Sequence, residues 1–295
     1  MVVNDVSLRH IYTAYSTLFN QGLGAATPIW SRIATPVPSS GTTTKLPWLK
    51  AIPGLRRWLG DRQVSNLAAS SYEFDKVEYE DTVEVSVREI EADQYGVFGP
   101  FMRLMGEAFA AFPDEQIWNA LAAGLTTACY DGQNFFSATH PVIDEDGVSG
   151  SVSNYTSGAQ TPWYLLVSNR GIKPVVWSVR KEEPFKQLTP AELVDRNKKI
   201  EYGCYVDAGI GYGFWQLAYL SKADLTADNY FTARSAIMNF YSDQGRKLGL
   251  IPDLLVVPPS LERKARKIVV SDLTTAGETN ELAGTAEVLV SPWLS

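Results

Sequence analysis

Three side chains suited to nucleophilic, acid-base or metal chemistry lie within one short stretch of the 295-residue sequence: Cys129, Asp131 and His140. A cysteine hydrolase combines a thiolate nucleophile, an imidazole base and an orienting carboxylate. Such partners usually come from distant segments, and no hydrolase signature surrounds Cys129. We therefore interpret the three residues as structural and predict that the protein is not an enzyme. A soluble cysteine hydrolase using Cys129 and His140 is the alternative from a different functional class.

Other signals for metal or cofactor binding are weak. The sequence has two histidines and two cysteines, and no ligand spacing such as HxxxH or CxxC occurs. Gly209, Gly211 and Gly213 resemble a dinucleotide-binding loop only loosely, because Phe214 and Trp215 follow where that motif requires a third glycine and a helix. We predict no metal site and no cofactor, and we expect these glycines to relieve crowding in an aromatic strand.

The composition argues against a nucleic-acid reader and against a membrane protein. The formal net charge of -7 opposes a surface that matches nucleic acid as a whole. No apolar run is long enough to cross a bilayer, and the start of the chain shows no secretion signal. Two cysteines supply no disulfide framework, so a packed core must hold the fold. We interpret a basic cluster as a solvated helix face, with phosphate contact as the alternative: Arg263, Lys264, Arg266 and Lys267.

A helix and an extended arm are predicted for residues 1–45. Apolar residues recur at helical spacing from Leu8 to Phe19, and Gly22 and Gly24 are expected to end the helix. The rest of this segment is interrupted by prolines and by a serine, glycine and threonine run. Such an arm has little core of its own, so it either packs against a neighbouring domain or chain or remains a floppy tail.

A loop, a strand and a long helix are predicted next. Residues 46–81 combine tryptophans with prolines and glycines, which is typical of an extended hairpin loop. Alternating valines predict a strand over Thr82–Ile90. A helix is predicted over residues 100–124, with a proline in its first turn and a glycine at its end. Pro113 lies inside it, so we expect a kink, or a break and restart, at that point.

The remaining chain mixes strands and helices without the regular alternation of a doubly wound sheet or barrel. A loop-rich stretch covers residues 128–162, and strands are predicted within 161–180 and 202–221 from their β-branched and aromatic residues. The later predicted elements are a helix capped by Thr226, a strand over Leu254–Val257, a helix over residues 261–269 and a strand over Ala286–Ser291. This mixture predicts the α+β class.

Five segments together resemble the Mu-like major head subunits of tailed phages. They are WLGDR (58–62), CYDGQNFFSATHPV (129–142), GYGFWQLA (211–218), RKLGLIPDLLVVPPSLE (246–262) and ELAGTAEVLVSPWL (281–294). The segments occur in order over nearly the full chain. Because several glycine- and aromatic-bearing motifs occur together in that order, the resemblance is specific.

The resemblance implies the capsid fold first seen in phage Hong Kong 97. Its expected parts are an N-terminal arm (1–45), an extended hairpin loop (46–81), a mainly peripheral lobe (82–221) with a spine helix (100–124), and a mainly axial lobe with a closing strand (222–295). The independently predicted arm, loop and long helix agree with this plan.

The resemblance also implies a structural role. Subunits would assemble through pentamers and hexamers into an icosahedral virion capsid that encloses double-stranded DNA without reading its sequence. Assembly would take place in the host cytoplasm, with scaffold, portal and decoration proteins as partners, and the net charge predicts an acidic inner wall. A shell around a protein cargo is the alternative on the same fold. The candidate contact residues are Ile11, Tyr12, Tyr15, Trp48, Trp58 and Arg62.

Overall fold

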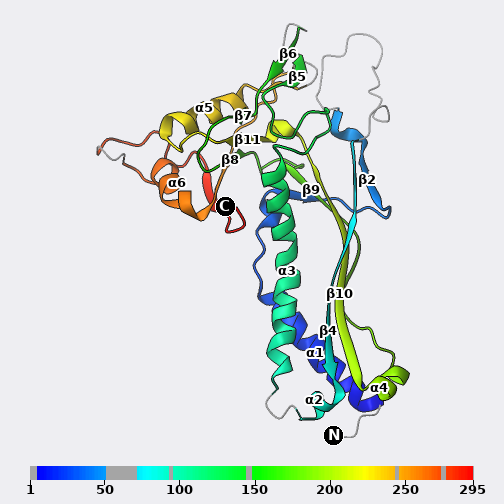
Figure 1. The fold of residues 1–295 in the computed structure, drawn as a ribbon. Coiled ribbons are helices and arrows are strands. Elements are labelled where there is room, and N and C mark those ends of the chain that lie inside the picture. The colour runs from blue at the N-terminus through cyan, green and yellow to red at the C-terminus, as the bar shows by residue number, and fades with distance from the viewer. Residues whose placement is uncertain are drawn as a thin grey trace.

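The computed structural model describes residues 5–50, 72–92, 96–143, 148–242, 246–273 and 277–294. Figure 1 shows a narrow shaft that carries a broader head. The shaft contains α1 (Asp5–Ala25), α3 (Phe98–Ala123), β4 (Val77–Ser86), β9 (Val175–Gln187) and β10 (Lys199–Tyr212). The head is built on a five-stranded sheet. Helices and strands are mixed without a repeating order, which confirms the predicted α+β class.

Helix α1 packs against α3 along the shaft (Figure 1). The predicted helix end is wrong, because α1 continues through both Gly22 and Gly24. Gly22 lies where the two helices cross, and a Cβ atom there would overlap the carbonyl oxygen of Arg103. The glycine therefore permits close contact between the helix backbones instead of ending the helix.

The segment after α1 packs against its own chain. It forms a short helix, η1 (Trp30–Arg32), and then β1 (Ala34–Pro36), which pairs in parallel with β9. Ile33 and Ala34 are buried there. The floppy-tail alternative is wrong for this segment, since it adds an edge strand to the shaft sheet and side chains to the core.

The base of the predicted hairpin loop lies next to this segment. Strand β2 (Thr43–Leu46) pairs antiparallel with β3 (Tyr72–Asp75), and a short helix, η2 (Pro47–Lys50), follows β2. Residues 51–71, the remainder of the predicted loop, lie outside the described residues.

The shaft sheet has the strand order β1-β9-β10-β4. Strand β10 pairs antiparallel with β4 from Lys199 opposite Ser86 to Ala208 opposite Val77. Helix α4 (Ala191–Asn197) connects β9 to β10 at the end of the shaft away from the head (Figure 1). The core of the shaft is formed by buried side chains of β10, such as Ile200 and Tyr202, together with Phe19 of α1 and Met102 and Met105 of α3.

The strand predicted over Thr82–Ile90 has different bounds in the structure. Strand β4 begins earlier, at Val77, and ends at Ser86, where helix α2 (Val87–Ala92) starts. Val87 and Ile90 both pack against the same core cluster. A spacing of three residues places two side chains on one face of a helix. In a strand the same two side chains would point to opposite faces, so only the helix lets both reach this core.

Helix α3 is one continuous helix, and the predicted break at Pro113 is wrong. Figure 1 shows it as an upright rod without a sharp bend. Pro113 has no N–H to donate to the preceding turn, but its neighbours are anchored on both sides. The Phe112 ring packs edge-on against Tyr79 at a centroid distance of 4.7 Å, and the Asp114 carboxylate accepts a hydrogen bond from Ile29 N. These contacts hold the helix across the missing bond.

The head sheet has the strand order β13-β12-β8-β11-β7. Its strands are β7 (Tyr155–Thr156), β8 (Trp163–Leu166), β11 (Ala218–Ser221), β12 (Leu254–Val257) and β13 (Glu287–Val290). Helices α5 (Ala227–Met238) and α6 (Glu262–Val269) lie against it, and Thr226 caps α5 as predicted. The sheet joins strands from both sides of the lobe boundary predicted at residues 221 and 222, because β8 pairs with both β11 and β12.

Candidate functional site

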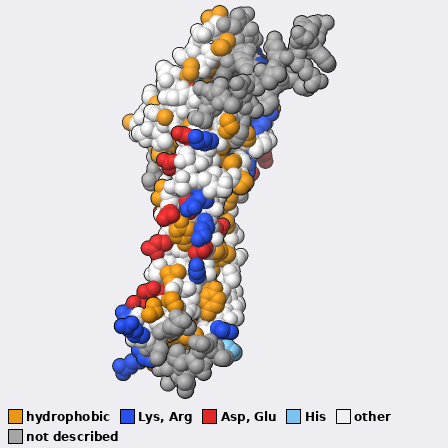
Figure 2. All heavy atoms as spheres, turned by 90° about the vertical axis from the view of Figure 1, so that its right-hand side faces the viewer, with side chains coloured by type: hydrophobic (Ala, Val, Ile, Leu, Met, Phe, Trp, Pro, Cys, Tyr) orange, Lys and Arg blue, Asp and Glu red, His pale blue; other side chains and the backbone are white. Residues whose placement is uncertain are grey.

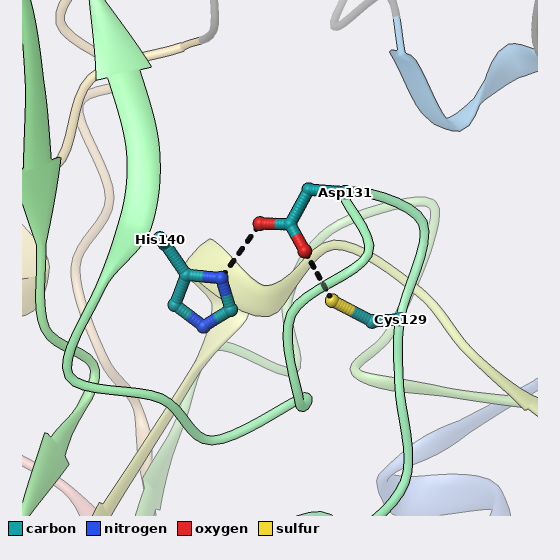
Figure 3. Close-up of side chains that lie close together, drawn as sticks. All are labelled: Cys129, Asp131 and His140. Atoms are coloured by element: carbon teal, nitrogen blue, oxygen red, sulfur yellow. Dashed lines mark hydrogen bonds and ion pairs between the residues drawn. The ribbon is translucent and has the colours of Figure 1, made fainter.

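The predicted cluster of Cys129, Asp131 and His140 lies in the head, in the segment between α3 and the hairpin of β5 (His140–Ile143) and β6 (Ser149–Val152). Figure 3 shows the carboxylate of Asp131 between the other two side chains. The Cys129 thiol donates to Asp131 Oδ1 at 3.1 Å, and Asp131 Oδ2 lies 2.7 Å from His140 Nδ1. The backbone N–H of Gln133 also donates to Asp131 Oδ1, at 2.9 Å.

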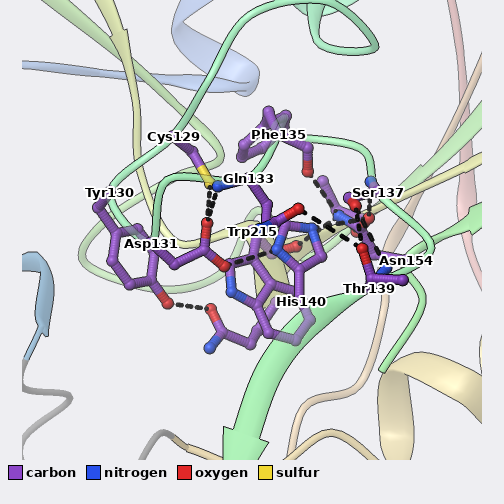
Figure 4. Close-up of polar contacts among 12 residues, drawn as sticks. Cys129, Tyr130, Asp131, Gln133, Phe135, Ser137, Thr139, His140, Asn154 and Trp215 are labelled. Carbon is purple, nitrogen blue, oxygen red and sulfur yellow. Dashed lines mark hydrogen bonds and ion pairs between the residues drawn. The ribbon is translucent and has the colours of Figure 1, made fainter. Parts of the chain in front are cut away.

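His140 is fully buried and held on three sides. Its ring stacks on the indole of Trp215 with a centroid distance of 4.1 Å and an interplanar angle of 5°. Its Nε2 atom lies 3.1 Å from Asn154 Oδ1 (Figure 4). The Asn154 amide in turn donates to the backbone carbonyls of Phe135, Trp215 and Ala218. The cluster therefore ties the loop after α3 to the head.

The arrangement cannot work as the catalytic triad of a cysteine hydrolase. In such a triad the imidazole contacts the sulfur, whereas here the carboxylate separates them. Burial and the neighbouring Asp131 raise the pKa of the Cys129 thiol, so the thiolate nucleophile is disfavoured. Burial also acts to raise the pKa of Asp131, but hydrogen bonds from His140, Cys129 and Gln133 outweigh it and leave this pKa below its usual value. The hydrolase alternative is wrong.

One chemical property of the cluster was missed by sequence reasoning. The three potential donor atoms, a thiol sulfur, a carboxylate oxygen and an imidazole nitrogen, all lie within 4.8 Å of one another. The spacing C-x-D-x8-H matches none of the familiar metal motifs, so only a search for mixed ligand types within one loop could have found it.

The predicted contact residues of the N-terminal helix lie on the side of α1 that faces its own chain. Tyr15 is buried and contacts the Tyr202 ring edge-on at 5.5 Å, which leaves little of its ring for a neighbouring subunit. Tyr12 is half-buried, stacks on Phe185 and donates to its carbonyl oxygen. Ile11 is also half-buried. Ile11 and Tyr12 remain candidates through their exposed parts.

The other predicted contact residues stay predictions. Trp48 lies in η2, and its side chain is outside the described part of the structure. Trp58 and Arg62 lie outside the described residues altogether.

An exposed apolar stripe on α3 was not predicted. Phe101 and Leu104 are 47% and 60% exposed on the helix, and Val97, which precedes it, is 66% exposed. The spacing of four and then three residues places these side chains on one face, which we call the α3 stripe. The sequence carries this periodicity, but the same helix buries Met102 and Met105, so the pattern alone does not tell which face is covered.

Charges of both signs alternate along the shaft face shown in Figure 2. Lys181 and Lys186 both lie within ion-pair distance of Glu183, and Lys199 pairs with Glu84 at 2.7 Å. On α6, Lys264 pairs with Asp224 and Arg266 with Glu262, and all four basic side chains of this helix are exposed. These pairs agree with the interpretation of the basic cluster as a solvated face.

Among the described residues, no helix combines the length and apolar character that a membrane crossing requires.

Comparison with known sequences gives matches over the whole chain. The family model described as "Mu-like prophage major head subunit gpT" matches residues 8–294. The major capsid protein of Escherichia phage Mu is 33% identical over 305 residues, covering 100% of both chains. The Mu-like prophage FluMu major head subunit of Haemophilus influenzae is 34% identical over 280 residues, covering 90% of this chain and 89% of that protein.

Comparison with solved structures gives the same result. A chain of the procapsid of bacteriophage JBD30 superposes with a TM-score of 0.83 at 34% identity, covering 99% of this chain and 100% of that chain. A chain of the JBD30 capsid decorated with minor capsid protein trimers gives a TM-score of 0.74 at 26% identity, with 92% of each chain covered. Both relatives are capsid subunits, which confirms the predicted capsid fold and structural role. The chain belongs to the family of Mu-like prophage major head subunits.

Proposed function

We propose that this head subunit assembles through pentamers and hexamers into an icosahedral shell that encloses double-stranded DNA. The observation that carries the proposal is the match over the whole chain, from the N-terminal helix to the last strand, to subunits of phage heads. Such a shell needs head-to-tail contacts between two different surfaces of the same chain. A long shaft joined to a broad head offers well-separated surfaces for these contacts.

The α3 stripe is a candidate for one of these contact surfaces. Large apolar side chains that stay exposed in a row on one helix face are typical of interaction sites. The shaft face with alternating charges is a second candidate surface, because its charged side chains can pair with a neighbouring subunit without a fixed angle. We assign the α3 stripe, together with the predicted residues Trp48, Trp58 and Arg62, to contacts between subunits.

The partners that we propose extend beyond other copies of the chain. One relative is described as decorated with minor capsid protein trimers. For this chain we propose decoration, scaffold and portal proteins as partners, assembly in the host cytoplasm, and contact with packaged DNA without sequence readout. The net charge of -7 supports a largely acidic inner wall, which would not bind the packaged DNA tightly. A reconstruction of a filled particle that showed a strongly basic lining would contradict this last point.

Electron microscopy and chromatography test the proposal. The purified chain, alone and with a co-produced scaffold protein, should elute as very large particles that appear as closed shells in negative stain. A chain that remains monomeric in both preparations contradicts the proposal. Particles from phage-producing cells should contain nuclease-protected DNA, whereas a protein cargo in place of DNA would favour the cargo-shell alternative.

A further inference from the structure

The polar cluster of the head contains three side chains of the types that bind metal ions. Cys129, Asp131 and His140 bring three donor atoms of the kinds that bind metal ions within 4.8 Å of one another. We propose that these three side chains bind one zinc ion, which fixes the loop after α3 to the head sheet. No activity is attributed to this ion, and the proposal does not depend on the assembly of the chain into a shell.

The orientation of Asn154 determines which nitrogen of His140 can bind a metal. The Asn154 amide nitrogen donates to three backbone carbonyls, and its Oδ1 accepts from Ser137 N at 2.9 Å, so the side-chain oxygen must be the atom that faces the imidazole. His140 Nε2 therefore carries a hydrogen and donates to this oxygen. In the neutral imidazole, the lone pair is then on Nδ1. A metal-binding histidine typically has this arrangement, with its second nitrogen donating to a fixed oxygen.

The lone pair of Nδ1 points at another acceptor. Asp131 Oδ2 lies only 2.7 Å away, and two atoms that both carry lone pairs come this close only with a hydrogen or a metal ion between them. The Cys129 sulfur, 3.1 Å from the other carboxylate oxygen, favours the metal and selects zinc over magnesium or calcium, because thiolates are soft ligands.

Charge and geometry are compatible with zinc. A zinc ion would displace the thiol proton to solvent, and its two positive charges would balance the thiolate and the carboxylate in a buried site. Tetrahedral zinc separates its ligand atoms by about 3.3 to 3.6 Å, so Nδ1 and Oδ2 must move apart by about 0.6 Å. A side-chain rotation of Asp131 provides this, since its side chain is 9% exposed and is therefore not packed on every side. A water molecule can enter as the fourth ligand where this side chain reaches solvent.

Metal analysis of the untagged, full-length protein tests the proposal directly. After incubation with zinc chloride and desalting, inductively coupled plasma mass spectrometry should find about one zinc per chain in the wild type. Cys129→Ser, Asp131→Asn and His140→Gln should each lower the zinc content at least about tenfold. The matched control is Cys204→Ser, because Cys204 is the other buried cysteine and lies on β10, where its thiol faces the Asp81 carbonyl. This variant should keep the zinc of the wild type.

Cobalt substitution shows whether the thiolate is a ligand even if a variant is less stable. Cobalt added to the metal-free wild type should give the near-ultraviolet band of a thiolate-cobalt bond, and the Cys204→Ser variant should give the same band. The band should be absent from Cys129→Ser at equal folded protein, as judged by far-ultraviolet circular dichroism. A band that disappears with Cys204 and persists without Cys129 would overturn the assignment.

The heat stability of the wild type decides between a bound zinc ion and a bridging hydrogen. If zinc is bound, a strong chelator should lower the unfolding temperature of the wild type, added zinc should restore it, and Cys129→Ser should show neither change. A wild type that takes up no zinc and unfolds at the same temperature with and without chelator overturns the proposal. The cluster would then be held by its hydrogen bonds alone.

Discussion

Single atoms decide how closely the two shaft helices approach. At the crossing of α1 and α3, Gly22 contacts the Arg103 backbone, and Gly106 contacts the backbone of Phe19. A Cβ atom at either glycine would overlap a backbone carbonyl oxygen, which cannot move without moving its helix. These two positions therefore require glycine for packing, although both lie inside helices, where glycine is intrinsically unfavourable.

Gly106→Ala should lower the free energy of unfolding of the subunit by about 1–3 kcal/mol, because the added methyl group separates the helices. The matched control is Gly24→Ala on the same helix as Gly22, where no atom lies within 4 Å of the added methyl group. That variant should be as stable as the wild type or more stable by up to about 1 kcal/mol. Urea denaturation followed by circular dichroism measures both, and equal effects of the two substitutions would contradict the packing explanation.

Whether a helix continues or ends is decided by the contacts that its residues make with neighbouring elements. Helix α3 continues through Pro113 because Phe112 and Asp114 are anchored to the shaft sheet and to the segment after α1. The missing hydrogen bond is still a cost to the helix, and the contacts around it only offset that cost. The same helix exposes the α3 stripe near its N-terminal end, so it both organises the shaft and offers a surface.

Pro113→Ala should raise the free energy of unfolding by about 1–3 kcal/mol, because alanine restores a helical N–H and removes the ring from the preceding turn. Pro100→Ala is the control, since Pro100 lies in the first turn of α3, where the backbone N–H has no helical partner. It should change stability by less than about 0.5 kcal/mol. If Pro113→Ala destabilised the subunit, the proline would have a packing role that outweighs its backbone cost.

Leu104→Asp tests the α3 stripe as an assembly surface. Because Leu104 is 60% exposed, the free energy of unfolding should change by less than about 0.5 kcal/mol. A buried contact between subunits would lose an apolar side chain and gain an unpaired charge, so the yield of particles on size-exclusion chromatography should fall sharply. Leu104→Met keeps the apolar contact and should assemble like the wild type. Normal particles from Leu104→Asp would remove the stripe from the candidate contacts.

At the scale of the whole molecule, the N-terminal segment belongs to the protomer. Leu8, Tyr15 and Phe19 are buried in the shaft, and Ile33 and Ala34 are buried in the larger core that extends into the head. The sequence left open whether the predicted arm of residues 1–45 packs against a neighbouring domain or chain or remains a floppy tail. The described contacts make most of this segment part of the fold of its own chain.

Deletion of residues 1–45 should therefore prevent stable folding and not merely block assembly. Each fully buried large apolar side chain contributes about 1.5–3 kcal/mol. The loss of several of them approaches the total stability of a typical protein, about 5–15 kcal/mol. The truncated chain should be insoluble or should unfold without a cooperative transition in a thermal melt. A soluble truncated chain with a sharp transition would show that the segment is dispensable for the fold.

The sequence by itself determined most of the elements and the family. Helical periodicity, the Thr226 cap and the run of apolar residues over Leu254–Val257 are local signals, and each gave an element close to the predicted position. The ordered motifs identified the capsid fold because they extend over the full chain. The glycines of β10 also act as predicted, since a Cβ atom at Gly211 would overlap the ring of Phe74.

Only the tertiary structure decided the features that depend on contacts between distant residues. The continuation of α1 past Gly22, the unbroken α3 and the pairing of β8 with both β11 and β12 each require a partner far away in the chain. The same holds for the cluster around His140, because Asn154 and Trp215 orient an imidazole that the sequence places only near Cys129 and Asp131. Local patterns set which elements form, whereas packing sets where they end and which side chains meet.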